Sequence, residues 1–285
     1  MDEKKGLFRY GIACALEQLP ERQPVILRGE IQAIAKQVKD IGYDAIELHL
    51  KNPREYDGKL LKKAAADNGI GFSAIATGME YTVNGLSLIS DDPEARRAAV
   101  DRLKEHIDLC AQLDCALIVG IMRGNIPDFS KYMRYEGYLT QALVELSDYA
   151  RGSGVQIVFE AIMRYINNYL CNVPETVDYL DGLGQDNVRI HIDTHLMNVE
   201  DKDMRHAVRC CRGKLGYVHF SDSNRRYPGG GSVDFLSVMQ ELAAIGYNGY
   251  VVMECVPWPD GQTCARRALR YVKALEECIA VKSAE

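Results

Sequence analysis

The sequence of 285 residues has no apolar run as long as the roughly eighteen residues needed to cross a bilayer. Its start, MDEKKGLFRYGIAC, lacks the apolar stretch and the cleavage pattern of a signal peptide. The chain also lacks a basic surplus, since 34 Lys and Arg stand against 40 Asp and Glu, a formal net charge of -6. Binding to nucleic acid requires a clustered basic surface. We therefore expect a cytoplasmic protein that has neither nucleic acid nor a membrane as partner.

Two further features are missing, a linker and a disulfide framework. No Pro/Gly/Ser-rich segment or long run of charge marks a domain boundary. The nine cysteines are odd in number and scattered, and Cys14, Cys115 and Cys255 lie in or beside apolar runs, as small core residues do. This cysteine usage fits a reducing compartment. A chain of this length and composition can bury one large core, so we expect residues 1–285 to form a single domain.

What the sequence does have is a repeated alternation of short apolar runs with segments of helical spacing. The runs have strand length and cover residues 8–14, 45–50, 71–77, 116–122, 155–161, 188–194, 215–221 and 250–255. Nearly continuous apolar strands in alternation with helices predict a parallel sheet buried on both faces. Eight units favour an α/β fold of the single (β/α)8 TIM barrel type, with an open doubly wound sheet as the alternative. Gly42, Gly69 and Gly246 stand where helix ends need a positive φ.

Four consecutive runs end in a polar residue, and in barrels the carboxyl ends of the strands carry the functional groups. These residues are Glu160, Asp193, His219 and Glu254. A single strand-end acid commonly caps a helix or pairs with an arginine, but three carboxylates at one mouth repel each other unless a cation neutralises them. Oxygen ligands with one imidazole suit Mn²⁺, Mg²⁺ or Co²⁺. The sequence therefore predicts a site for one divalent metal ion, most readily Mn²⁺.

These four residues and their surroundings resemble a known family. The segments FEAIMRY, IDTHLMN, HFSDSNRRYPGGG and MECVPWP are similar to the xylose-isomerase-like barrel superfamily, specifically to ketose 3-epimerases of the tagatose/psicose type. Residues 76–124 resemble the branch that epimerises keto-sugar acids such as 5-keto-L-gluconate. The resemblance implies that the metal chelates the carbonyl and hydroxyl oxygens of an open-chain carbohydrate, with Glu160 and Glu254 on either side of the carbon that loses its proton. It also implies a homo-oligomer, either a dimer or a tetramer.

Two departures from the family pattern concern the substrate. The pattern places a histidine where this chain has Leu196, and the imidazole stands one residue earlier, at His195. A shift of one residue in an extended segment turns a side chain to the other face, so His195 either lines the site or points away. The pattern also has a glutamate where this chain has Ile166, which predicts that the substrate end held there is less polar or differently placed.

Other residues are candidates for contact with substrate. Arg225 matches the family's substrate-contacting arginine, and Arg123 could hold a carboxylate or phosphate. His49 ends its strand near the expected pocket, and Trp258 lies between two prolines in a loop that forms either an apolar wall or an oligomer contact.

Three histidines remain outside that set. His191 shares the inward face of its strand with Asp193 and is either a core histidine or a group that holds a metal ligand in place. We expect His106 and His206, on helices, to be solvated.

The sequence therefore predicts a metal-dependent epimerase or isomerase of an open-chain keto-sugar or keto-sugar acid, in which the two glutamates move the proton. A metal-dependent lyase that performs β-elimination on a 3-oxo-glycoside is the alternative, motivated by Leu196 and Ile166. An apurinic endonuclease would need a basic face and more metal ligands than this chain offers. A sugar-binding subunit that keeps the barrel without catalysis is the non-enzyme alternative.

Overall fold

A computed structural model describes residues 6–282 of the chain. The strands are β1 (Arg9–Ala15), β2 (Leu27–Arg28), β3 (Ala45–His49), β4 (Gly71–Ala76), β5 (Ala116–Val119), β6 (Ile157–Glu160), β7 (Val188–Asp193), β8 (Leu215–Phe220) and β9 (Tyr250–Met253). The α-helices are α1 (Ile31–Ile41), α2 (Gly58–Ala66), α3 (Gly78–Thr82), α4 (Pro93–Leu113), α5 (Tyr132–Arg151), α6 (Val173–Leu183), α7 (Thr194–Glu200), α8 (Met204–Cys210), α9 (Phe235–Ala244) and α10 (Gly261–Lys282). Short 3₁₀ helices are η1 (Pro53–Glu55), η2 (Ile121–Arg123) and η3 (Phe129–Lys131).

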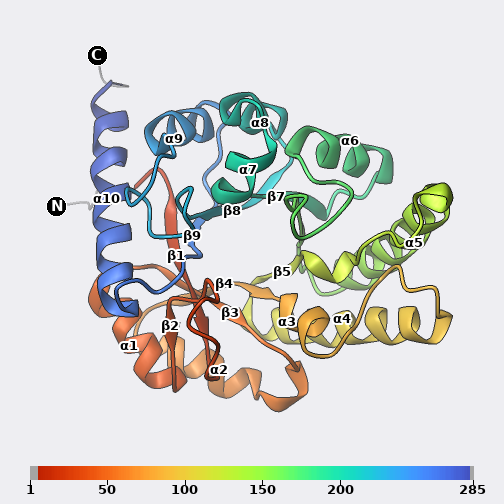
Figure 1. The fold of residues 1–285 in the computed structure, drawn as a ribbon. Helices are drawn as coiled ribbons and strands as arrows, with labels where there is room; N and C mark the ends of the chain where they lie inside the picture. Colours follow the sequence, from red (N-terminus) through yellow and green to blue (C-terminus); the bar gives the residue numbers. More distant parts are fainter. Residues whose placement is uncertain (1–5, 283–285) are drawn as a thin grey trace.

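The strands form one closed parallel barrel surrounded by helices (Figure 1). Each strand from β3 to β9 pairs in parallel with the next, and β1 pairs with both β3 and β9, which closes the ring. The short strand β2 pairs in parallel with the end of β1 and lies outside the closed ring. The predicted (β/α)8 TIM barrel is confirmed, and the open doubly wound sheet is excluded by the pairing of β1 with β9.

The ends of the described chain lie together. In Figure 1 the last helix, α10, stands beside β1 and α1. The Tyr43 hydroxyl donates to the Ala265 carbonyl at 2.9 Å, and the Phe8 amide donates to the Glu276 carboxylate at 3.1 Å. Residues 1–5 and 283–285 lie outside the described residues, so the extension of one domain over 1–285 stays a prediction.

Helix ends follow the chemistry expected of the sequence. Gly42, Gly69 and Gly246 have φ values of 102°, 67° and 79°, as predicted, and the Gly42 amide donates back to the Val38 carbonyl at the end of α1. Asp92 accepts from the Glu94 amide at 2.9 Å and so caps α4. Within residues 6–282 we find no helix that combines the length and the apolarity needed to span a membrane.

Inward-facing residues fill the barrel below its carboxyl end. Ala74, Ala76, Ile118, Val158, Tyr217 and Val252 form a small apolar cluster, separate from the main core of buried residues. Successive side chains of a strand alternate between faces. Residues two positions after Val158, Tyr217 and Val252 therefore lie above this cluster, at the mouth of the barrel.

Candidate metal centre and active site

Glu160, Asp193, His219 and Glu254 meet at the mouth because each stands at the carboxyl end of its strand. Glu160 and Asp193 are the last residues of β6 and β7, His219 is the penultimate residue of β8, and Glu254 follows β9. All four lie on adjacent strands of the barrel, so their side chains share one end of it. The structure thus brings together the four residues that the sequence singled out.

His219 Nδ1 is the point on which the three carboxylates converge. It lies 3.4 Å from Glu254 Oε2, 3.9 Å from Asp193 Oδ2 and 4.0 Å from Glu160 Oε1. This nitrogen is buried and has no hydrogen-bond partner within the described chain. An unpaired buried nitrogen among three carboxylates is costly unless something binds it. Three oxygen donors and one imidazole nitrogen match the donor set of a hard divalent cation, so the residues fit a metal ion.

Protein cations balance part of this negative charge. Arg225 donates to Asp193 Oδ2 and Glu254 Oε2, and to Ser221 Oγ at 3.1 Å. Its backbone has a φ of 61°, in the left-handed region that non-glycine residues seldom adopt. The sequence had identified this arginine as a substrate contact, and the structure places it directly against two of the predicted metal ligands.

The two glutamates differ in their acidity. Burial, with repulsion from Glu254 and Asp193, raises the pKa of Glu160 to about 8. Burial also acts on Glu254, but the positive charges of Arg225 and His219 lower the pKa of that carboxyl to about 2. In the absence of a metal the first is protonated and the second ionised at neutral pH.

Glu47 lies in the site, although our sequence reasoning did not assign it there. It is fully buried on β3, and its two oxygens accept from His49 Nε2 at 2.8 Å and from His219 Nε2 at 2.7 Å. Because Nε2 of His219 is held by Glu47, Nδ1 is the nitrogen turned toward the other carboxylates. Although burial lowers the pKa of His219, Glu47 and Glu254 raise it well above its ordinary value. The signal was the spacing of two between Glu47 and His49 in AIELHL, which places both on one face.

His191 lies beside the ring of His219. The centroids of the two rings are 4.2 Å apart, and the ring planes are nearly perpendicular. The Tyr217 ring also contacts His191, with 5.2 Å between the two centroids. Both ring nitrogens of His191 are buried without a hydrogen-bond partner among residues 6–282, and burial holds its pKa well below the ordinary value. His191 is therefore a buried core histidine that packs against His219, and its role in holding a metal ligand in place stays a prediction.

A cavity of about 380 Å³ opens over these residues. Its lining includes Glu160, His219, Glu254, Arg225 and His49. His49 Nε2 is 3.9 Å from Glu254 Oε1. His49 and Arg225, two of the candidate substrate contacts, therefore line this cavity, and their contact with substrate stays a prediction.

Three other predicted substrate contacts do not line this cavity, namely His195, Trp258 and Arg123. His195 turns Nδ1 toward the Asp222 carbonyl at 3.2 Å. Trp258 is 44% exposed, and its ring packs against the Arg226 guanidinium, whose carbon is 3.9 Å from the ring centroid. His195 and Leu196 are consecutive residues of α7, and Leu196 lines the cavity, so the shifted imidazole points away from it.

Arg123 corrects our interpretation of the fourth strand. It is fully buried and donates to the backbone carbonyls of Gly120 at 3.4 Å, of Leu170 at 3.1 Å and of Glu160. Its guanidinium carbon lies 4.5 Å from the centroid of the Phe159 ring. These contacts occupy the guanidinium, so Arg123 holds the backbone of β6 in place and does not receive a substrate carboxylate.

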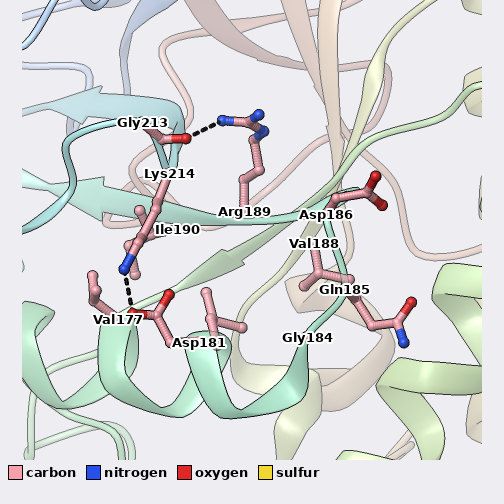
Figure 2. A pocket seen from close by; sticks show the side chains of 11 residues that line it. Val177, Asp181, Gly184, Gln185, Asp186, Val188, Arg189, Ile190, Gly213 and Lys214 are labelled. Carbon is pink, nitrogen blue, oxygen red and sulfur yellow. Dashed lines mark hydrogen bonds and ion pairs between the residues drawn. The ribbon is translucent and has the colours of Figure 1, made fainter.

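A second hollow, shown from close by in Figure 2, lies at the amino ends of β7 and β8. It is lined by residues at the start of β7, such as Val188 and Arg189, and by Gly213 and Lys214 just before β8. Lys214 pairs with Asp181, and Arg189 donates to the Gly213 carbonyl at 2.9 Å. Two more of its polar residues, Asp186 and Gln185, are bonded by Arg151 outside the lining. The hollow lies at the amino ends of the strands, away from the four convergent residues.

Comparison with known proteins agrees with the fold and identifies the family. The sequence model of the xylose isomerase-like TIM barrel family matches residues 35–275. The chain is 30% identical to a ketose 3-epimerase of Arthrobacter globiformis over 226 residues, 79% of this chain and 77% of that protein. It is also 30% identical to a D-psicose 3-epimerase of Agrobacterium fabrum, over 77% of each chain. A solved structure of an L-ribulose 3-epimerase superposes with a TM-score of 0.84 at 25% identity, over 97% of both chains.

Proposed function

The chain belongs to the xylose isomerase-like TIM barrel family, and on that premise we propose that it is a metal-dependent epimerase of an open-chain keto-sugar or keto-sugar acid. The observation that carries the proposal is the convergence of Glu160, Asp193 and Glu254 on the unpaired Nδ1 of His219. The relatives named as ketose 3-epimerases support the choice of reaction and of substrate class.

We infer that Glu160, Asp193, His219 and Glu254 hold one divalent cation, with Mn²⁺ preferred and Mg²⁺ or Co²⁺ as substitutes. A cation bound there would polarise a substrate carbonyl and so acidify the adjacent C–H bond. Glu47 keeps the imidazole of His219 oriented for this role.

The two glutamates supply the acid and the base. Both line the cavity. An ionised carboxylate removes the proton from the carbon beside the carbonyl, and the other carboxyl returns a proton to the opposite face. His49 and Arg225, from the same cavity, contact the substrate oxygens.

The test is incorporation of solvent deuterium, followed by NMR, over a panel of ketohexoses, ketopentoses and keto-sugar acids with Mn²⁺ present. We expect label at the carbon beside the carbonyl together with an epimer, and loss of both in Glu160→Gln and Glu254→Gln. Glu277→Gln, at an exposed position on α10, is the matched control and keeps full activity. Exchange with none of these compounds overturns the proposal, and release of a leaving group from a 3-oxo-glycoside replaces it with the lyase.

We further propose that residues 1–285 act as one domain in a cytoplasmic homo-oligomer, a dimer or a tetramer. The nine unpaired cysteines support a reducing compartment. Light scattering coupled to size-exclusion chromatography measures the oligomeric state directly, and a mass equal to that of one chain contradicts it.

A further inference from the structure

Residues 222–233, called here the arginine loop, follow β8 and carry Arg225. One fully buried aspartate, Asp222, holds the loop together. Its Oδ1 accepts from the Val233 amide at 3.0 Å, and its Oδ2 accepts from the Gly229 amide at 2.9 Å. The carboxylate at the start of the loop therefore fixes both its middle and its end.

Arg225 has a left-handed backbone in this loop, with a φ of 61°. A non-glycine residue keeps such a conformation only where neighbouring contacts fix it. Two backbone hydrogen bonds do so. The Arg225 amide donates to the Asp222 carbonyl at 2.8 Å, and the Val256 amide, after β9, donates to the Arg225 carbonyl at 2.9 Å. The direction of the guanidinium toward Asp193 and Glu254 therefore depends in part on the Asp222 carbonyl.

The start of α7 is bonded to the chain that follows β8. Thr194 Oγ1 donates to the Ser221 carbonyl at 2.7 Å and accepts from the Ser221 amide at 3.0 Å. In the next residue, His195 Nδ1 lies 3.2 Å from the Asp222 carbonyl oxygen. Because a carbonyl oxygen only accepts, Nδ1 of His195 is the donor of this bond. The Asp222 carbonyl thus receives two hydrogen bonds, one from the Arg225 amide and one from the His195 ring.

We propose, on the basis of the proposed function, that His195 is a positioning residue that acts on the substrate through Asp222 and Arg225. Its ring ties α7 to the arginine loop and so fixes the guanidinium that lines the cavity. His195 itself does not line the cavity, whereas Leu196 does. The imidazole that stands one residue earlier than in the family pattern therefore has a role of its own, outside the cavity.

The test uses two amides, each of which reproduces one nitrogen of the imidazole. Asparagine places its amide group near the position of Nδ1, and glutamine places it near Nε2. His195→Asn therefore keeps a donor for the Asp222 carbonyl, and His195→Gln loses it. We expect kcat/KM to fall about tenfold in His195→Gln, mainly through KM, and less than about threefold in His195→Asn. Equal losses in the two variants overturn the proposal.

A double-substitution cycle shows whether His195 acts through Arg225. Arg225→Lys keeps the charge but loses the planar fork that His195 is proposed to position. In protein that already carries Arg225→Lys, we expect His195→Gln to lower kcat/KM by less than about threefold further. A further loss of about tenfold would mean that His195 acts independently of Arg225, and it contradicts the proposal.

Hydrogen exchange of the arginine loop tests the same bond without any substrate. We expect amide exchange within residues 222–233, resolved by mass spectrometry of peptides, to be about tenfold faster in His195→Gln than in His195→Asn. His206→Gln, at an exposed position of α8, is the control and leaves the exchange unchanged. Equal exchange in His195→Gln and in the unchanged protein rejects the positioning role.

The two kinds of measurement separate the two levels of the argument. Absence of epimerisation in the unchanged protein is a failure of the proposed function, and hydrogen exchange then decides this inference by itself. Epimerisation that does not distinguish His195→Gln from His195→Asn leaves the epimerase in place and rejects only this inference.

Discussion

Glu47 links two histidines that face the cavity, and the position of His219 depends on it. It is buried, and both of its oxygens are used by imidazole nitrogens at 2.7 and 2.8 Å. In Glu47→Gln one oxygen becomes an amide donor, so one imidazole must lose its acceptor or change its tautomer. We expect Mn²⁺ affinity to fall about 10- to 100-fold, measured by calorimetric titration of metal-free protein.

Glu277→Gln serves as the control for this substitution, since it changes the same chemical group on the exposed face of α10. Circular dichroism establishes that both variants are folded. Equal Mn²⁺ affinity in Glu47→Gln and in the unchanged protein would show that the imidazole keeps its orientation without the carboxylate.

Asp201 makes the free energy of unfolding depend on pH. Burial raises its folded-state pKa to about 6, although its carboxylate accepts from the Val173 amide at 3.1 Å. A carboxyl with a raised pKa contributes stability below its unfolded value near 4, and loses that contribution as the pH rises through about 6. We expect Asp201→Asn to stabilise the protein at pH 7.5 by at most about 3 kcal/mol and to have little effect at pH 4.

Urea unfolding of both proteins at these two pH values measures the difference. Asp178→Asn, on the exposed face of α6, is the control for replacement of a carboxylate by an amide. If Asp201→Asn stabilised the protein as much at pH 4 as at pH 7.5, the gain would come from new packing or hydrogen bonds. It would not come from removal of the buried negative charge.

Strand-end residues were predictable individually, whereas their partners were not. Glu160 and Glu254 stand out because a charged residue interrupts an apolar run at a defined end of the barrel. His106 was expected to be solvated, yet it is fully buried and its Nε2 bonds Glu80 Oε1 at 2.8 Å, while His206 is exposed as expected. Helical spacing predicts which face of its helix a residue lies on. The pairing of Glu80 with His106 depends on how α3 packs against α4, and the spacing of residues along the sequence does not predict that packing.

Among the elements, the turn after β5 is fixed to β6 by one side chain. Arg123 of η2 donates to the carbonyls of Gly120, Leu170 and Glu160, so it connects three segments beneath the site. Arg123→Lys keeps the charge but loses the planar fork, and leaves buried carbonyls without donors. We expect a loss of about 2–3 kcal/mol in the free energy of unfolding, measured with urea, and a lower kcat because Glu160 is no longer held.

Arg151→Lys is the comparison for this variant. Arg151 pairs with Asp186 on the surface, where such pairs contribute little, so the expected change is below about 1 kcal/mol. Equal losses in the two variants would mean that the carbonyls around Arg123 find other donors.

Eight strands were predictable because both faces of each are buried, which leaves an apolar run of the right length. The structure departs from these predictions at the ends of the strands. The run 116–122 continues past Val119, but Gly120 has a ψ of -110° and the chain turns into η2, so the apolar residues Ile121 and Met122 belong to a turn. β2 escaped prediction because two residues, Leu27 and Arg28, carry no periodicity.

At the scale of the whole molecule, closure of the ring brings β9 back to β1 and places all carboxyl ends at one mouth. The mouth carries the charged cavity, while the opposite end carries paired surface residues (Figure 2). Three carboxylates gathered at that mouth weaken the metal-free protein by mutual repulsion, which Arg225 and His219 offset in part. We therefore expect the stability of the barrel to depend on whether the proposed metal site is occupied.

This coupling predicts the response of the whole fold to metal. A ligand that binds only the folded state stabilises it by mass action, by about 2.7 kcal/mol at a concentration one hundred times its Kd. We expect the thermal midpoint to rise with Mn²⁺ at constant ionic strength and to return after addition of EDTA. Differential scanning calorimetry measures both.

Asp193→Asn gives this prediction a sharp control. Asp193 Oδ1 caps α7 by accepting from the His195 amide at 2.7 Å, and asparagine caps helices equally well. The variant therefore keeps the cap, removes one of the three repelling charges and deletes a metal ligand. The amide nitrogen that replaces Oδ2 cannot accept from Arg225, so we expect metal-free Asp193→Asn to be less stable than the unchanged protein. We expect it to gain little further stability from Mn²⁺. A full gain in the variant would place the bound metal away from the centre formed by β6 to β9, because the variant lacks one of the four proposed ligands.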